Sequence, residues 1–491
     1  MKPATLAVAV AIAAPSTMPL AQPFDAPPPP AAPRPFVIAA PVVDTLDNGL
    51  RVVVAPRRSL PLVTVSLLVR SGAETDPPAL SGLADMTATL LAKGTATRTA
   101  PQIADAAEAL GGTLETGAGW DRSQVSITVT APQLAAALAL VADVVQHPRF
   151  AQRELDRARR QARDNLSVAM GDPGSLARMA VDRAAFGDGA YGHPAGGTPG
   201  SLKRIRRADV VAQHKTLYRP DNATLIFAGD VDAAEARALA GQVFGSWARP
   251  TPALTPPRVD SAGAAAPTPV VLAIEDAGQA GVAFAAPGIR RDAVDYYPGV
   301  IANALVGGGY SSRLNQELRI RRGLTYGVGS SLDARRDGGV WKIAAQTRNE
   351  SAAEFVQVTL DEVERVREAA PTPAELEARK MTVIGAMSRR YETTASLAGA
   401  IAALEATGVA PTEITRTIDA LGAVTPDEVL AFARAHWDPA ALAIVVAGDA
   451  ATFVEALRAR HPNLRIVPQA DVDLDSASLT RPAAPGRPAS R

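Results

Sequence analysis

The chain has 491 residues, of which 47% are hydrophobic, so it is long enough for two or more globular domains. Its 50 Lys and Arg residues balance 50 Asp and Glu residues, which gives no electrostatic reason to expect nucleic acid or an anionic membrane as a partner. The absence of cysteine excludes disulfides, zinc–thiolate sites and thiol catalysis.

The N-terminus has the layout of a secretory signal peptide. Lys2 precedes the apolar run "ATLAVAVAIAA", which is too short to span a bilayer comfortably. We therefore expect a signal peptide over residues 1–21 and an exported, periplasmic protein without a membrane anchor. Residues 22–37 include "PFDAPPPPAAPRPF", and this composition predicts an extended proline-rich spacer.

The first half of the mature chain, residues 38–247, mixes strands and helices without strict alternation. This order favours an α+β domain with an antiparallel-rich sheet. Asn48–Gly49 is a typical hairpin turn, and Gly94 is a typical helix stop. The predicted elements are a hairpin over 42–54, strands over 62–69 and 124–130, a helix within 81–95 that ends at Gly94, and helices over 101–110 and 132–145.

A long repeat is visible in the sequence. "YRPDNATLIFAGDVDAAEARAL" begins at Tyr218, and "HWDPAALAIVVAGDAATFVEAL" begins at His436. Each copy has a proline, then an apolar run ending in Gly-Asp, then a helical pattern, which predicts strand, turn and helix. A repeat of this length indicates a duplicated domain. We expect a linker over residues 248–269, a second domain over 270–470 and a disordered tail over 471–491.

Four segments in order resemble the insulinase/pitrilysin-type (inverzincin) metallopeptidase family, in its bacterial processing-peptidase-like branch. They are "LDNGLRVVV", "GAETDPPALSGLADMTATLLAKGT", "YRPDNATLIFAGDVD" and "GGGYSSRLNQELRIRRGLTYGV". The match runs from about Val42 to Leu457. The resemblance implies two homologous domains that face each other as a clam-shell, each a mostly antiparallel sheet packed with helices.

The resemblance also shows what this chain lacks. Active members carry His-x-x-Glu-His between Gly-Leu-Ala and Lys-Gly-Thr, and both flanks are present here. The two ligand positions hold Asp85 and Thr89, and the general-base position holds Ala88. Alanine cannot take a proton from water, and Asp with Thr offers only one good ligand. The family's third ligand position falls on Asn165, or on Asp164 if the alignment shifts by one residue.

The second half retains residues that the family uses to bind substrate. The resemblance places an arginine and a tyrosine, which contact the substrate beside the scissile bond, at Arg319 and Tyr326 in "LRIRRGLTYGV". The local pattern predicts a helix over "SSRLNQELRIRR" followed by a strand. Without the resemblance, Arg319 would be read as a solvated arginine near a helix end, and Tyr326 as a half-buried strand residue.

A glycine triplet precedes this predicted helix. Gly307, Gly308 and Gly309 are similar to the glycine-rich substrate loop of the non-catalytic subunit of the mitochondrial processing peptidase. Glycine lets a backbone approach a peptide closely. The same triplet is equally compatible with a plain turn, so both interpretations stay open.

Three functions follow from these patterns. In the leading hypothesis the chain is a non-catalytic, substrate-binding subunit that forms a heterodimer with a homologous His-x-x-Glu-His peptidase subunit. Zinc is then expected in that partner and no metal or other cofactor in this chain. The first alternative is a stand-alone peptide-binding or scaffold protein without a proteolytic role. The second is a peptidase whose metal is held by Asp85, Asp164 and other oxygen ligands, which would suit calcium or magnesium better than zinc.

Overall fold

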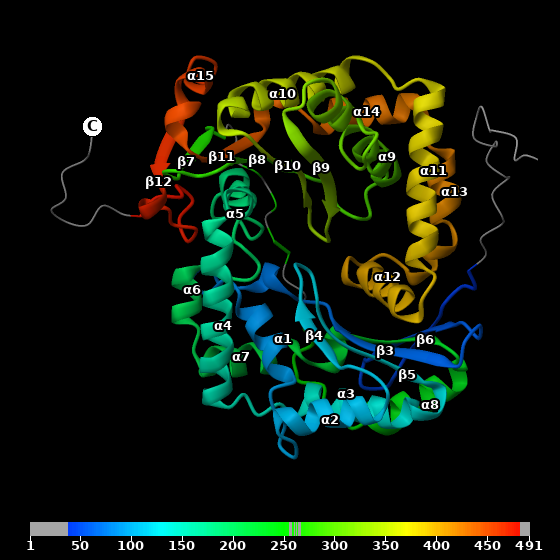
Figure 1. The fold of residues 1–491 in the computed structure, drawn as a ribbon. Helices are drawn as coiled ribbons and strands as arrows, with labels where there is room; N and C mark the ends of the chain where they lie inside the picture. Colours follow the sequence, from blue (N-terminus) through cyan, green and yellow to red (C-terminus); the bar gives the residue numbers. More distant parts are fainter. Residues whose placement is uncertain (1–37, 255–257, 260, 262, 264–266, 482–491) are drawn as a thin grey trace, which may run out of the picture. The chain divides into compact units, whose positions relative to one another are not determined.

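The computed structural model describes residues 38–254, 258–259, 261, 263 and 267–481. The predicted signal peptide and spacer, parts of the linker and residues 482–491 of the predicted tail lie outside this range. The described chain contains two six-stranded sheets, one in each half, and each is packed with helices (Figure 1). None of the described helices is long and apolar enough to cross a membrane.

The first sheet has the strand order β1-β2-β6-β3-β5-β4, and only the β2–β6 pair is parallel. The β1–β2 hairpin turns where Asn48 accepts a hydrogen bond from the backbone N–H of Leu50 (3.1 Å). The strands of this half are β1 Val42–Thr45, β2 Arg51–Pro56, β3 Leu62–Val69, β4 Glu115–Ala118, β5 Ser123–Thr130 and β6 Ala223–Gly229. Its α-helices are α1 Leu83–Leu91, α2 Ala100–Ala109, α3 Leu134–Gln146, α4 Gln152–Gly171, α5 Pro173–Phe186, α6 Pro199–Arg204, α7 Arg207–Leu217 and α8 Ala233–Phe244.

The second sheet has the order β12-β7-β11-β8-β10-β9. Between α9 and β9 the chain forms a π-helical segment, Asn315–Arg321, where the sequence predicts an ordinary helix. The strands are β7 Val270–Ala273, β8 Ala280–Pro287, β9 Thr325–Ala334, β10 Gly339–Thr347, β11 Ala443–Gly448 and β12 Arg465–Pro468. The α-helices are α9 Tyr296–Val306, α10 Ala352–Glu368, α11 Pro373–Arg390, α12 Thr394–Ala406, α13 Thr417–Ala423, α14 Pro426–His436 and α15 Val454–Arg458.

The two sheets confirm the predicted duplication and the α+β fold class. Strands β6 and β11, which carry the two copies of the repeat, occupy the same central place in their sheets. The halves differ at one edge: β1 precedes the core strands of the first sheet, whereas β12 follows those of the second. Gly229 ends β6 with φ +136°, and a Cβ there would lie 2.1 Å from the carbonyl oxygen of Leu62. The first Gly-Asp pair therefore needs its glycine.

The two halves exchange helices. Helix α5 of the first half buries Leu176 and Val181 against β7, β8 and β11 of the second sheet. Helix α12 of the second half buries Leu397 and Ile401 against β2, β3 and β6 of the first sheet. On the opposite face of the first sheet lie α2, α3 and α8 (Figure 1). Each sheet is thus covered on one face by a helix from the other half, and both halves share buried cores.

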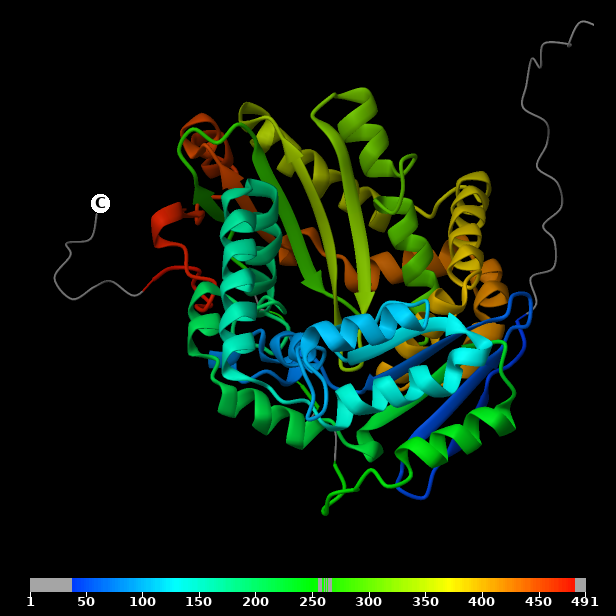
Figure 2. The same ribbon diagram turned by 60° about the horizontal axis from the view of Figure 1, so that its bottom comes forward.

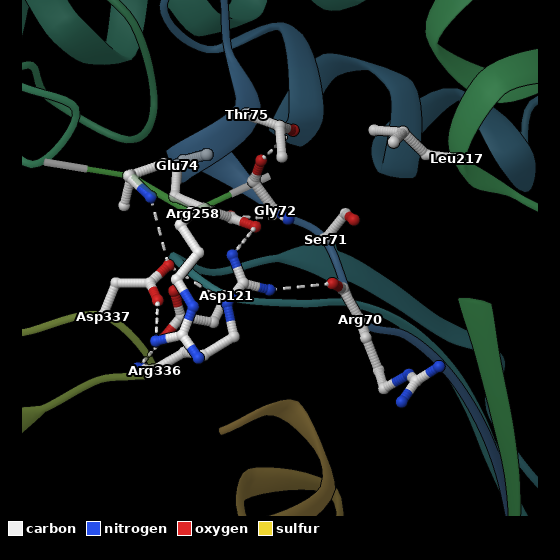
Figure 3. A network of polar contacts seen from close by, with 12 residues as sticks. Arg70, Ser71, Gly72, Glu74, Thr75, Asp121, Leu217, Arg258, Arg336 and Asp337 are labelled. Carbon is white, nitrogen blue, oxygen red and sulfur yellow. Dashed lines mark hydrogen bonds and ion pairs between the residues drawn. The ribbon is translucent and has the colours of Figure 1, made fainter. Parts of the chain in front are cut away.

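The turn between β9 and β10 also ties the halves together. The strands of this hairpin run toward the first half (Figure 2). The side chain of Arg336 donates to the carbonyl oxygen of Arg70 (3.2 Å) and pairs with Glu74 (3.2 Å), as Figure 3 shows. Its backbone N–H donates to Asp121 (2.9 Å). Next to it, the guanidinium carbon of Arg335 lies 4.2 Å from the ring centre of Trp120.

The tail over residues 471–491 is predicted to be disordered, but its first part is folded. Residues 471–481 pack onto the molecule, with Val472, Leu474 and Leu479 buried in the same core as α5. The carbonyl oxygen of Leu474 accepts from Arg183 Nε (3.2 Å), and Asp475 pairs with Arg204 (3.0 Å). The stretch is rich in Asp and Ser, and this polar composition leads to the prediction of disorder. Its three apolar residues are nevertheless sufficient to anchor it in the core.

Candidate functional site

Helix α1 is fixed by its apolar stripe and by a carboxylate at its N-terminus. Leu83, Met86, Leu90 and Leu91 are buried, as their helical spacing predicts. Asp76 accepts hydrogen bonds from the backbone N–H groups of three residues at the helix start, at 2.7, 3.1 and 2.9 Å. A negative charge is favourable there because the first N–H groups of a helix lack intrahelical partners. Burial nevertheless raises the pKa of Asp76 to about 7.

The structure brings three of the four degenerate zinc-site positions to one cavity. Asp85 and Thr89 of α1 and Asn165 of α4 line a cavity of about 960 Å³. Ala88 is fully buried and lies outside this lining. Asp164 lines a different cavity, so Asn165 is the α4 residue that faces α1. Burial raises the pKa of Asp85.

These residues do not fit a catalytic zinc ion. Zinc in peptidases is held by imidazole nitrogens and a carboxylate, with an open position for water. The three positions here offer one carboxylate, one hydroxyl and one amide, and the amide oxygen of Asn165 accepts from Gln161 (2.9 Å). Among the described residues, no three His, Asp or Glu side chains are grouped as metal ligands. Since Asp85 and Asp164 line separate cavities, they do not form a joint oxygen site either.

Arg319 and Tyr326 lie side by side on the second half. The guanidinium carbon of Arg319 lies 4.6 Å from the ring centre of Tyr326 and 4.2 Å from that of Tyr310. Tyr326 is 88% exposed and Tyr310 is 62% exposed. Within the described part of the chain, the side chain of Arg319 makes these two stacking contacts and neither a hydrogen bond nor an ion pair. Its N–H groups are therefore available to an acceptor on another molecule.

The π-helical segment and β9 position this stack. Asn315 bridges them, because its side chain donates to the carbonyl oxygen of Val328 (2.7 Å) and accepts from the N–H of the same residue (3.2 Å). Ser312 stands at the start of this helical segment, where its carbonyl oxygen accepts from the N–H of Gln316 (2.9 Å) and its hydroxyl accepts from the side chain of Asn315 (3.2 Å). Tyr326 follows at the beginning of β9, so the pair sits on two elements locked to each other.

The glycine triplet is mostly packed. The carbonyl oxygen of Gly307 accepts from the N–H of Ser330 in β9 (3.0 Å), and a Cβ at Gly307 would lie 2.7 Å from the hydroxyl of Ser330. A Cβ at Gly308 would lie 2.6 Å from Ala304 Cα in α9. At Gly309 the space is open. These contacts give Gly307 and Gly308 a structural role in a tight turn.

Sequence reasoning missed Tyr310, which completes the stack on Arg319. The signal was present in "GGGYSSR", where an aromatic residue follows a tight glycine turn next to the helix that carries Arg319. Asp76 was also missed. It lies six residues before the first N–H group that it binds, which is farther than the usual helix-capping spacing.

Comparison with known proteins gives the family. Residues 51–198 match the model described as Insulinase (Peptidase family M16), and residues 204–383 match the model described as Peptidase M16 inactive domain. An uncharacterized zinc protease of Mycobacterium tuberculosis is 30% identical over 401 residues, which cover 82% of this chain and 91% of that protein. An uncharacterized zinc protease of Streptomyces coelicolor is 27% identical over 79% of this chain and 86% of its own length.

Two solved structures have the same fold as this chain. The crystal structure of a peptidase M16 inactive domain from Pseudomonas fluorescens has a TM-score of 0.77 and 27% sequence identity, covering 83% of this chain and 98% of that one. A protease from Helicobacter pylori has a TM-score of 0.77 at 19% identity, covering 83% of this chain and 99% of that one, and so shows the shared fold. This chain belongs to the insulinase, or M16, family of peptidases.

Proposed function

We propose that this chain is the non-catalytic, substrate-binding subunit of a two-chain zinc metallopeptidase. A homologous partner brings His-x-x-Glu-His, the zinc ion and the attacking water. One observation carries the proposal: the helix that should hold zinc has neither a ligand set nor a base, whereas Arg319 and Tyr326 remain adjacent and exposed. The expected signal peptide places the complex in the periplasm, and its substrates are peptides.

The exposed stack has the chemistry to bind a peptide near the bond that is cut. A guanidinium and a phenol both donate hydrogen bonds, and such donors hold a carbonyl oxygen and favour the negative charge that develops on it. The rings of Tyr310 and Tyr326 hold the guanidinium between them. A fixed guanidinium loses less conformational freedom when substrate binds, so its donors act with less cost in free energy.

Turnover of the reconstituted complex tests this role. The chain is purified with a homologous His-x-x-Glu-His subunit, either as wild type or with the double substitution Arg319→Ala and Tyr326→Phe. We expect the double substitution to lower kcat by about 10²–10³-fold, the usual cost of removing a transition-state donor, and to leave assembly intact.

Arg321→Ala is the matched control. Arg321 lies two residues from Arg319 in the same segment, and its partner is Glu317 (2.8 Å) within the chain. This variant should cleave at the wild-type rate. If the Arg319 and Tyr326 double variant also cleaves at that rate, the chain has no substrate-binding role at the scissile bond.

A further inference from the structure

A second cavity lies between the two halves, away from the Arg319 stack. It has a volume of about 320 Å³ and is lined from the β4–β5 turn, from β9 and from the junction of α11 and α12. Four arginines line it: Arg122, Arg291, Arg335 and Arg390. The carboxylates in the lining are Asp121 and Asp333. The cavity therefore carries an excess of positive charge.

Both carboxylates already have partners. Asp121 accepts from the hydroxyl of Tyr191 (3.2 Å) and from the backbone N–H of Arg336 (2.9 Å). Asp333 pairs with Arg335 (2.7 Å). In the described part of the chain, the guanidinium groups of Arg122, Arg291 and Arg390 have no hydrogen bond or ion pair, although that of Arg291 stacks on Tyr296 (3.7 Å to the ring centre). The two lining carboxylates thus offset only part of the positive charge of the four arginines, and three of these arginines form no ion pair among the described residues.

Arg335 adds a buried donor with no acceptor. The residue is 3% exposed, and its Nη1 makes no hydrogen bond among the described residues. A buried donor without a partner is costly, and so is a buried charge without a counter-charge. Burial lowers the pKa of the Arg122 guanidinium, and the nearby charge of Arg390 lowers it further. Asp121 and Asp333 act in the opposite direction on this pKa, and an anionic ligand would offset the positive charge that remains in the lining.

We propose that this cavity binds a small organic anion with two or more negative charges, of the polycarboxylate or phosphate-ester class. Arginine forks bind carboxylate and phosphate oxygens in a bidentate manner. Ala400, Ala403 and Leu404 of α12 form an apolar wall for the carbon part of the ligand. The volume suits a small metabolite-sized molecule. Because the site is built from both halves, its ligand adds contacts across their junction.

Calorimetric titration of the full chain with citrate and, separately, with inorganic pyrophosphate at constant ionic strength tests the site. We expect one equivalent of at least one probe to bind and to raise Tm. Trp120 lines the cavity, so its fluorescence should change on binding. Arg390→Gln should weaken binding by about tenfold or more, the effect of one charge-assisted hydrogen bond. Arg390 is exposed, so this variant should fold.

Arg389→Gln is the matched control, because Arg389 is exposed, adjacent on α11 and outside the cavity lining. It should bind as the wild type does. Arg122→Gln should abolish the anion-induced rise in Tm and should raise Tm in anion-free buffer, because it lowers the excess of positive charge in the lining and removes a desolvated guanidinium. The proposal is overturned if neither probe binds the wild type, or if Arg390→Gln and Arg389→Gln bind equally well.

Discussion

At the scale of single residues, Glu74 makes the stability of the contact between the two halves depend on pH. The residue is 3% exposed, and its carboxylate pairs with Arg336 (3.2 Å) and accepts from the backbone N–H of Gly72 (2.7 Å). Burial raises its pKa to about 8, with the nearby charge of Asp121 acting in the same direction. The folded state therefore binds this proton more tightly than the unfolded chain does. The stability that Glu74 contributes is fully present below about pH 4.5 and is lost as pH rises through about 8.

We predict that the free energy of unfolding falls by about 1 kcal/mol between pH 7 and pH 9, since one pH unit of differential protonation is worth about 1.4 kcal/mol. Asp76, with its pKa of about 7, contributes in the same direction at the lower end of this range. Denaturant unfolding followed by circular dichroism measures the slope. Glu74→Gln, which keeps the acceptor for Gly72, should flatten it. An unchanged slope in this variant would show that Glu74 is already ionised at pH 7.

At the scale of elements, helix α1 shows what sequence can and cannot predict. Its apolar stripe is predictable from helical spacing, but its end is not: Gly94 predicts the stop, and the helix ends earlier, at Leu91. The sequence does not decide between Asn165 and Asp164, because the motif can be aligned in two ways that differ by one residue. Adjacent residues on a helix point about 100° apart, so only one of the two can face α1. The structure places Asn165 opposite α1. It also buries Ala88, whereas Asp85 and Thr89 on the same helix line the cavity.

A graft on α1 and α4 tests this geometry. We predict that Asp85→His, Thr89→His and Asn165→Glu together create a zinc site, because they supply two imidazoles one turn apart and a facing carboxylate. Metal analysis after dialysis should find about one zinc per chain, and none in the wild type. The matched variant carries Asp164→Glu in place of Asn165→Glu and should bind zinc at least tenfold more weakly. Equal zinc binding by the two grafts would contradict the placement of Asn165.

In the segment before β9, the sequence predicts that a helix forms but not which type of helix. The sequence predicts a helix there, and the chain does form one, but over Asn315–Arg321 it is π-helical. Over seven residues, the apolar spacings of α- and π-helices are too similar to be separated from sequence. The stack of Tyr310, Arg319 and Tyr326 depends on this segment and on its bridge to β9. Motif spacing alone therefore identifies Arg319 and Tyr326 but not Tyr310, the third residue of the stack.

At the scale of the whole molecule, the duplication was predictable and the exchange of helices was not. Hydrophobic periodicity shows that α5 and α12 have apolar faces, but it carries no information on which sheet each face covers. Their order in the chain predicts that residues 173–186 belong to the first domain and residues 394–406 to the second. In the structure each completes the core of the other half. The two halves are therefore one connected unit.

The proposed role requires that this chain cannot activate a hydrolytic water by itself. Peptidase activity of the isolated chain, measured with and without a metal chelator on a mixed peptide library, tests it most directly. We predict no chelator-sensitive cleavage by the chain alone, and chelator-sensitive cleavage once the His-x-x-Glu-His partner is added. Chelator-sensitive cleavage by the isolated, partner-free chain would show that the chain is itself a metallopeptidase and not a non-catalytic subunit.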